Sequence, residues 1–253
     1  GADYHPGSLL TPFVALTAFA RGSSPASLVW DVPMSLPAGA ENELNPDGTF
    51  HGPVNYRIAL ANDYVAPVAV LFQQYDPQIV WSIASASGLS LTEDGSASAT
   101  LLFDGGETNL MEIARAYSIL AANGTSHGVA DPSSGAVESV TVLKVETLKG
   151  QTLVDNSQPD RQPIVSTSMA YLINNILSDE TARWTSLGQA NVLEIDRPAA
   201  VKIGQVTNKS QVWTVGYTPQ RLVLTWVGNQ RDNSRLTYTD YRMSAGLWQA
   251  LIK

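Results

Sequence analysis

The sequence predicts an α+β fold, in which a helical part precedes an antiparallel sheet. Apolar residues recur at helical spacing through much of the first half, whereas short runs rich in Val, Ile, Thr and Trp gather towards the end of the chain. Helices that are followed by a cluster of strands framed by further helices are typical of α+β proteins. With 253 residues, of which 44% are hydrophobic and 15% charged, the chain can form one packed domain or two lobes.

In the first half, residues 8–21 are predicted to form a helix that ends at Gly22. The next segment, 22–53, is rich in Pro, Gly, Ser and Asn, and is expected to be a long irregular connection. Trp30 and Phe50 are the side chains expected to hold it against the protein. Further helices are predicted at 56–63, 66–74, 77–87 (with Gly88 as its C-cap) and 109–122, with a loop at 90–98.

In the second half, the segments 140–147 and 151–154 flank Lys149-Gly150 and predict a hairpin. Residues 166–177 have an amphipathic helical pattern, and Ser166 is its expected N-cap. Strands are predicted at 199–203, 211–217 and 221–227, the last two joined by a tight turn at 218–220, and a final helix at 240–252. We expect a single domain over residues 1–253, with a helical lobe at about 22–130 and a sheet-containing part formed by 1–21 and 131–253.

Composition and motifs argue against several classes of protein. The net charge of −8 and the lack of basic runs argue against binding to nucleic acid or to an anionic membrane surface. Without cysteine the chain has neither disulfides nor thiolate metal ligands. The histidines His5, His51 and His127 are far apart without metal-ligand spacing, and phosphate-binding glycine motifs are missing, so neither a metal nor another cofactor is expected.

Ser8 is the first residue that could carry chemistry. It follows Pro6-Gly7 and precedes an apolar run, so its side chain could cap the first helix. The alternative is a nucleophile at a helix N-terminus, where the helix dipole favours a developing alkoxide. A nucleophilic serine needs a base, and Thr11, one turn later on the same face, cannot usefully accept a proton.

The segment Pro6-Gly7-Ser8-x-x-x-Pro12-Phe13 resembles the Pro-Gly-Ser-x-x-Lys-Pro-Phe segment of class A penicillin-binding proteins, the bifunctional peptidoglycan synthases. Other segments agree with that family in order and spacing: Gly52-Pro53-Val54, Gly105-Gly106-Glu107, Ala122-Asn123-Gly124, Ala200-Val201-Lys202-x-Gly204, Trp213-x-Val215-Gly216-Tyr217 and Trp226-Val227-Gly228-Asn229. The resemblance covers essentially the whole chain. It implies the penicillin-binding transpeptidase fold, shared with serine β-lactamases, in which helices flank an antiparallel sheet beside a helical lobe.

The sequence departs from the family at all three motifs. Thr11 replaces the lysine that helps to deprotonate the serine of Ser-x-x-Lys enzymes. Asp63-Tyr64-Val65 stands where the family has Ser-x-Asn, so Asp63 adds a negative charge and Val65 removes the amide that binds substrate. The third motif, usually Lys-Thr-Gly, is Lys202-Ile203-Gly204-Gln205, which keeps Lys202 and Gly204 but loses the hydroxyls that hold a substrate carboxylate.

The resemblance and these departures together favour a transpeptidase-like domain of a cell-wall synthase that has lost catalysis and serves a structural, regulatory or peptide-binding role. The alternative is an active serine D,D-transpeptidase that cross-links stem peptides and is acylated by penicillin at Ser8. In that case Lys202 is the candidate base. Otherwise Asp63 and Lys202 are expected to form a salt bridge that fills the old site.

The resemblance also implies partners and a location. Expected partners are peptidoglycan stem peptides or other cell-wall proteins, on the outer face of the cytoplasmic membrane, where an upstream anchor would hold the protein. Full-length relatives carry an upstream glycosyltransferase that this chain does not contain. In the family, strands precede the serine helix, whereas only residues 1–7 precede Ser8 here. We therefore expect a smaller sheet, with an incomplete edge through which the chain self-associates or which the helix at 240–252 covers.

Overall fold

The computed structural model describes residues 4–34, 45–90, 99–102, 106–205, 211–228 and 240–253. Its main sheet has three antiparallel strands in the order β10-β9-β8, which confirms the three strands predicted near the end of the chain. They are β8 (Ala200–Gln205), β9 (Gln211–Tyr217) and β10 (Leu222–Gly228). The predicted turn between β9 and β10 is closed by a hydrogen bond from the Thr218 N–H to the Arg221 carbonyl, at 2.9 Å.

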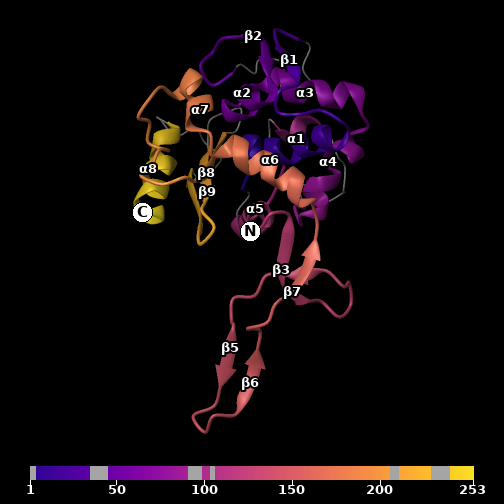
Figure 1. Ribbon diagram of the computed structural model, residues 1–253, viewed down its shortest axis with the longest axis vertical. Coiled ribbons are helices and arrows are strands. Elements are labelled where there is room, and N and C mark those ends of the chain that lie inside the picture. The colour runs from indigo at the N-terminus through magenta and orange to yellow at the C-terminus, as the bar shows by residue number, and fades with distance from the viewer. Residues whose placement is uncertain (1–3, 35–44, 91–98, 103–105, 206–210, 229–239) are drawn as a thin grey trace.

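This sheet lies between a C-terminal helix and the helical part of the protein (Figure 1). Helix α8 (Tyr241–Ile252), predicted at 240–252, packs against β9 and β10. Trp248 lies so close to β9 that a Cβ added at Gly216 would be 2.6 Å from its indole ring. All seven residues of β9 are buried, as expected for a central strand covered on both faces.

Helix α1 (Thr11–Ala20) forms the centre of the helical part, and nine of its ten residues are buried. The predicted helices around it are confirmed to within a few residues: α2 (Tyr56–Ala61), α3 (Val65–Gln74), α4 (Pro77–Ala86), α5 (Leu110–Ala121) and α6 (Thr167–Leu177). Ser166 caps α6 as expected, because its side chain accepts from the Met169 N–H. Although α6 comes from the second half of the sequence, it packs against α1 and α5.

The helical part differs from the prediction at three places. Residues 7–10 form a separate 3-10 helix, η1 (Gly7–Leu10), where one continuous helix was expected from residue 8. A second 3-10 helix, η2 (Ala99–Leu102), and helix α7 (Glu180–Leu187) were not predicted. Helix α7 has only eight residues and few of them are apolar, so its sequence carries a weak helical signal. The loop predicted at 90–98 falls almost wholly outside the described residues.

The connection expected at 22–53 is not irregular throughout. Strand β1 (Leu28–Asp31) pairs with β2 (Gly52–Asn55) in an antiparallel register that joins Leu28 to Asn55. The expected anchors were wrong, because Trp30 is 57% exposed and Phe50 is 37% exposed. The buried carboxylate of Asp31 holds the segment instead, accepting from the Asn45 side chain at 2.7 Å and from the His51 N–H at 2.9 Å.

A second small sheet was also missed, with strands in the order β4-β3-β7. They are β3 (Thr125–Ala130), β4 (Val137–Glu138) and β7 (Asp160–Pro163). Beyond it, β5 (Lys144–Glu146) and β6 (Thr152–Asp155) form the predicted hairpin, which extends away from the rest of the protein (Figure 1). Within the described part of the chain, no helix is both long and apolar enough to cross a membrane.

Candidate active site

Ser8 lies in η1, immediately before α1, and its side chain is not a helix cap. No side chain caps either helix at this point, so the capping interpretation is wrong. The Ser8 Oγ instead accepts a hydrogen bond from the Gln205 N–H at 3.1 Å, and donates one to Asp63 Oδ2 at 3.3 Å. The serine hydroxyl is therefore held between the end of β8 and the turn that precedes α3.

Close packing against β8 determines where η1 lies. A Cβ added at Gly204 would be 2.4 Å from the Leu9 Cγ and 3.0 Å from the Pro6 carbonyl oxygen, so only glycine admits η1 at this distance. Behind η1, the Tyr117 hydroxyl donates to the Leu9 carbonyl at 2.7 Å. Burial raises the pKa of Tyr117 well above its usual value, which keeps this phenol a neutral donor.

Thr11, at the position of the family's catalytic lysine, is buried and faces back towards η1. Its hydroxyl donates to the Ser8 carbonyl at 2.9 Å. This contact stabilises the junction between η1 and α1, but a threonine hydroxyl cannot take the serine proton at neutral pH. The side chain at this position thus supports the backbone of Ser8.

Asp63 lies in the turn between α2 and α3, with a backbone φ of 58°, in the left-handed region. Asn62 holds this turn against α7, since its amide donates to the Ala182 carbonyl at 2.7 Å and accepts from the Ser186 N–H at 3.0 Å. As a result, the Asp63 carboxylate points towards both Ser8 and Lys202. Aspartate tolerates a positive φ better than most residues, which fits its presence here.

Lys202, in the middle of β8, forms the expected ion pair with Asp63 Oδ1, and the side chains are only 2% and 6% exposed. The Lys202 Nζ also donates to the Ile203 carbonyl at 2.7 Å. Burial raises the pKa of Asp63 and lowers the pKa of Lys202, because for each group the cost of desolvating its charge outweighs the attraction of its partner.

The structure thus brings together Ser8, Asp63 and Lys202, with Gly204 and Gln205 beside them on β8. Val65 is the first residue of α3, and its side chain lies outside the described part of the structure. Sequence reasoning missed two contributors, the backbone N–H of Gln205 and the Tyr117 hydroxyl. No sequence signal identifies the Gln205 N–H, because every residue other than proline has such a group.

The site holds and polarises the Ser8 hydroxyl through the Gln205 N–H and the Asp63 carboxylate. Asp63 is positioned to accept the Ser8 proton. Among the described residues, no lysine or arginine nitrogen is hydrogen-bonded to the Ser8 Oγ, and the amine of Lys202 is held by Asp63 and by the Ile203 carbonyl.

The chain is similar in sequence to several penicillin-binding proteins, although no protein-family model matches it. It is 26% identical over 237 residues to penicillin-binding protein 1A of Neisseria cinerea, covering 90% of this chain and 28% of that protein. It is also 26% identical over 192 residues to penicillin-binding protein 1A of Clostridium acetobutylicum, covering 75% of this chain and 22% of that protein. The chain therefore spans less than a third of the length of these relatives.

Two solved structures show the same fold. The penicillin-binding protein PonA1 from Mycobacterium tuberculosis superposes with a TM-score of 0.79 and 21% identity, covering 98% of this chain and 68% of that one. Penicillin-binding protein 1A from Haemophilus influenzae superposes with a TM-score of 0.77 and 19% identity, covering 98% of this chain and 41% of that one. The fold is that of a penicillin-binding transpeptidase. Together with the sequence similarity, this fold supports a transpeptidase-like domain related to those of class A penicillin-binding proteins.

Proposed function

We propose that this domain no longer catalyses acyl transfer, and acts as a structural or peptide-binding module of a peptidoglycan synthase. The observation that carries the proposal is the buried ion pair between Asp63 and Lys202. It engages the lysine that remains from the family motifs, while the position of the other lysine holds Thr11, bonded to the Ser8 carbonyl.

The energetic argument rests on how serine nucleophiles are activated. Removing a general base costs a factor of about 100 to 10,000 in rate. Residues that act as one unit lose nearly all of their joint effect when a member is lost. Thr11 lacks a basic group and Lys202 is committed to Asp63, so two sources of activation are impaired in one site.

For such a module, the natural ligands are stem peptides or other cell-wall proteins. We place the full-length protein on the outer face of the cytoplasmic membrane, held there by a segment outside this chain. This placement rests on the similarity to the penicillin-binding proteins 1A. Those relatives are more than three times as long as the region that matches this chain.

A second candidate function is that of an active D,D-transpeptidase acylated at Ser8. The hydrogen bond from the Ser8 Oγ to Asp63 favours it, because a carboxylate of raised pKa is a better proton acceptor than an ordinary aspartate. Two solved relatives are described as a PonA1 complex with penicillin V and an imipenem acyl-enzyme of penicillin-binding protein A. The β-lactams bound to those two proteins are the reagents with which this chain should be tested.

The test is incubation of the chain with a fluorescent penicillin, followed by intact-mass measurement. We expect no stable adduct at Ser8, and the same result for Ser8→Ala. We also expect Thr11→Lys to remain unacylated, since the site around Asp63 is unchanged and the new ammonium would enter a buried position. A mass increase of one penicillin that disappears in Ser8→Ala would establish the second candidate function instead.

A further inference from the structure

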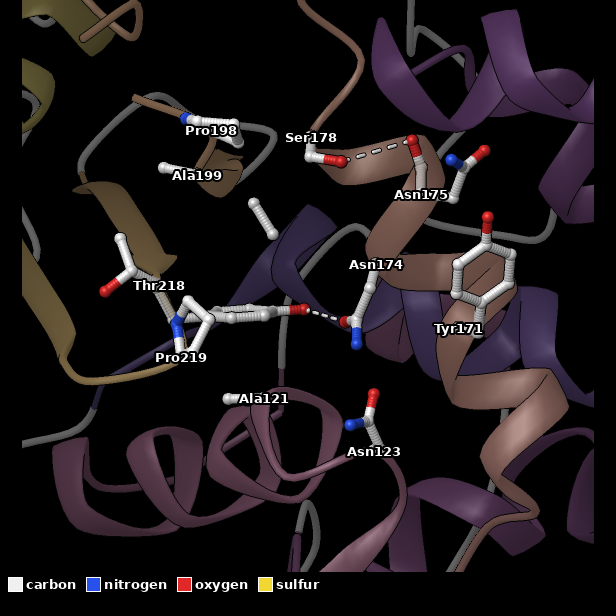
Figure 2. A pocket seen from close by; sticks show the side chains of 12 residues that line it. Ala121, Asn123, Tyr171, Asn174, Asn175, Ser178, Pro198, Ala199, Thr218 and Pro219 are labelled. Atoms are coloured by element: carbon white, nitrogen blue, oxygen red, sulfur yellow. Dashed lines mark hydrogen bonds between the residues drawn. The ribbon is translucent and has the colours of Figure 1, made fainter. Parts of the chain in front are cut away.

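A pocket of about 280 Å³ lies away from Ser8, between the ends of α5 and α6 and the edge of the main sheet (Figure 2). It is lined by Ala200, the first residue of β8, whereas the Ser8 Oγ contacts Gln205, the last residue of that strand. Five strand residues, at about 3.3 Å each, separate the two positions by roughly 16 Å. The pocket is therefore a separate site from the one that contains Ser8.

The pocket wall is partly apolar, and hydrogen bonds fix two of its side chains. The Tyr217 hydroxyl donates to Asn174 Oδ1 at 2.6 Å, and the Asn174 amide donates in turn to the Leu120 carbonyl at 2.9 Å, so both side chains are locked. Pro198 and Pro219 line one side and Asn123 the other (Figure 2). The two prolines and the alanines that line the pocket present apolar surfaces against which a ring can pack.

Two asparagine side chains offer hydrogen-bonding groups to a ligand in the pocket. The Asn123 side chain is exposed to solvent at the pocket, and no described residue is hydrogen-bonded to its amide group. Asn175 accepts from Arg57 Nη2 at 2.5 Å through its Oδ1, which leaves its Nδ2 as a donor. An asparagine amide offers both donors and acceptors, which matches a hydroxyl group on a ligand.

The charge of the site narrows the ligand class. None of the described residues that line the pocket is charged, and Arg57, behind Asn175, is paired with Asp179 at 3.0 Å. A charged ligand would lose hydration here without gaining a partner. The volume lies just below the roughly 300–1,000 Å³ of pockets for drug-sized molecules, so a ligand of one ring fits. We propose that this pocket is a binding site for one uncharged, hydroxyl-rich sugar ring.

The test is a titration of the full chain with N-acetylglucosamine, followed in nitrogen–proton correlation spectra that show the asparagine amides directly. A ligand of about 15 non-hydrogen atoms with a few hydrogen bonds should bind weakly, with a dissociation constant on the order of 1 mM. Glucosamine, which is cationic, and glucuronic acid, which is anionic, should bind at least fivefold more weakly.

Asn123→Gly is the decisive variant. Asn123 has a φ of 53°, which glycine adopts without strain, so this change removes the amide and keeps the backbone. We expect it to weaken binding about fivefold to tenfold through the loss of hydrogen bonds. Met111→Ala, an exposed position on α5, serves as the matched control, and Ser8→Ala should bind like the parent. Absence of saturable binding, equal binding of the charged sugars, or unchanged binding in Asn123→Gly would each overturn the proposal.

Discussion

At the scale of single residues, the ion pair of Asp63 and Lys202 has the largest energetic consequence. Both charges are removed from water, and the attraction between them only partly offsets that cost. Such a pair contributes little net stability, yet removing one member leaves the other charge buried and unpaired. The pair therefore constrains which residues the protein tolerates at these two positions.

We predict that Asp63→Asn lowers the free energy of unfolding by about 3–5 kcal/mol, because it leaves the Lys202 ammonium buried without a countercharge. Asparagine accepts the positive φ of this position, so backbone strain does not explain the loss. The double variant Asp63→Asn with Lys202→Met should recover most of that stability. Urea denaturation measures both effects. A single variant within about 1 kcal/mol of the parent would show that the Lys202 charge has another way to be neutralised.

At the scale of elements, the contact between η1 and β8 positions Ser8. The strand approaches η1 closely because Gly204 has no side chain, and the Gln205 N–H then meets the serine hydroxyl. The glycine of the third motif thus has a structural role in this chain that does not depend on catalysis.

Gly204→Ala should lower the free energy of unfolding by about 1–3 kcal/mol, since the new methyl group would overlap Leu9 and the neighbouring Pro6 carbonyl. Gly246→Ala is the control: an added Cβ there meets nothing within 4 Å, and its place inside α8 makes alanine stabilising by about 0.5–1 kcal/mol. Thermal and urea unfolding compare the two variants. Equal effects of the two changes would mean that η1 moves away from β8 at little cost.

At the scale of the whole molecule, the main sheet has three strands among the described residues, with β8 and β10 at its edges. β8 packs beside η1 and α6, and β10 contacts α5, while α8 packs against the sheet. Strand edges that present free backbone groups favour pairing with another chain. The projecting β5–β6 hairpin is a second exposed surface, with apolar side chains such as Leu148 and Leu153 open to solvent.

We predict that the chain self-associates through an edge of the main sheet, which sedimentation velocity over a range of concentrations would detect. A variant in which a short Gly-Ser linker replaces residues 144–155 shows which of the two surfaces mediates association. It should still associate, because the hairpin is not part of the main sheet. A monomer at every concentration would contradict the prediction, and association that disappears with the hairpin would assign it to that surface instead.

The sequence by itself determined the long helices, the three strands of the main sheet and the family, because helical periodicity, β-branched runs and motif spacing are local properties. Only the tertiary structure decided that β1 pairs with β2, and that Ser8 bonds to residues 55 and 197 positions away. The paired segments are only four residues long, too short for a periodic pattern, and lie more than 20 residues apart in sequence. Contacts of this kind depend on how the whole chain packs, so Asp63, Lys202 and the Gln205 N–H acquire their partners only in the folded protein.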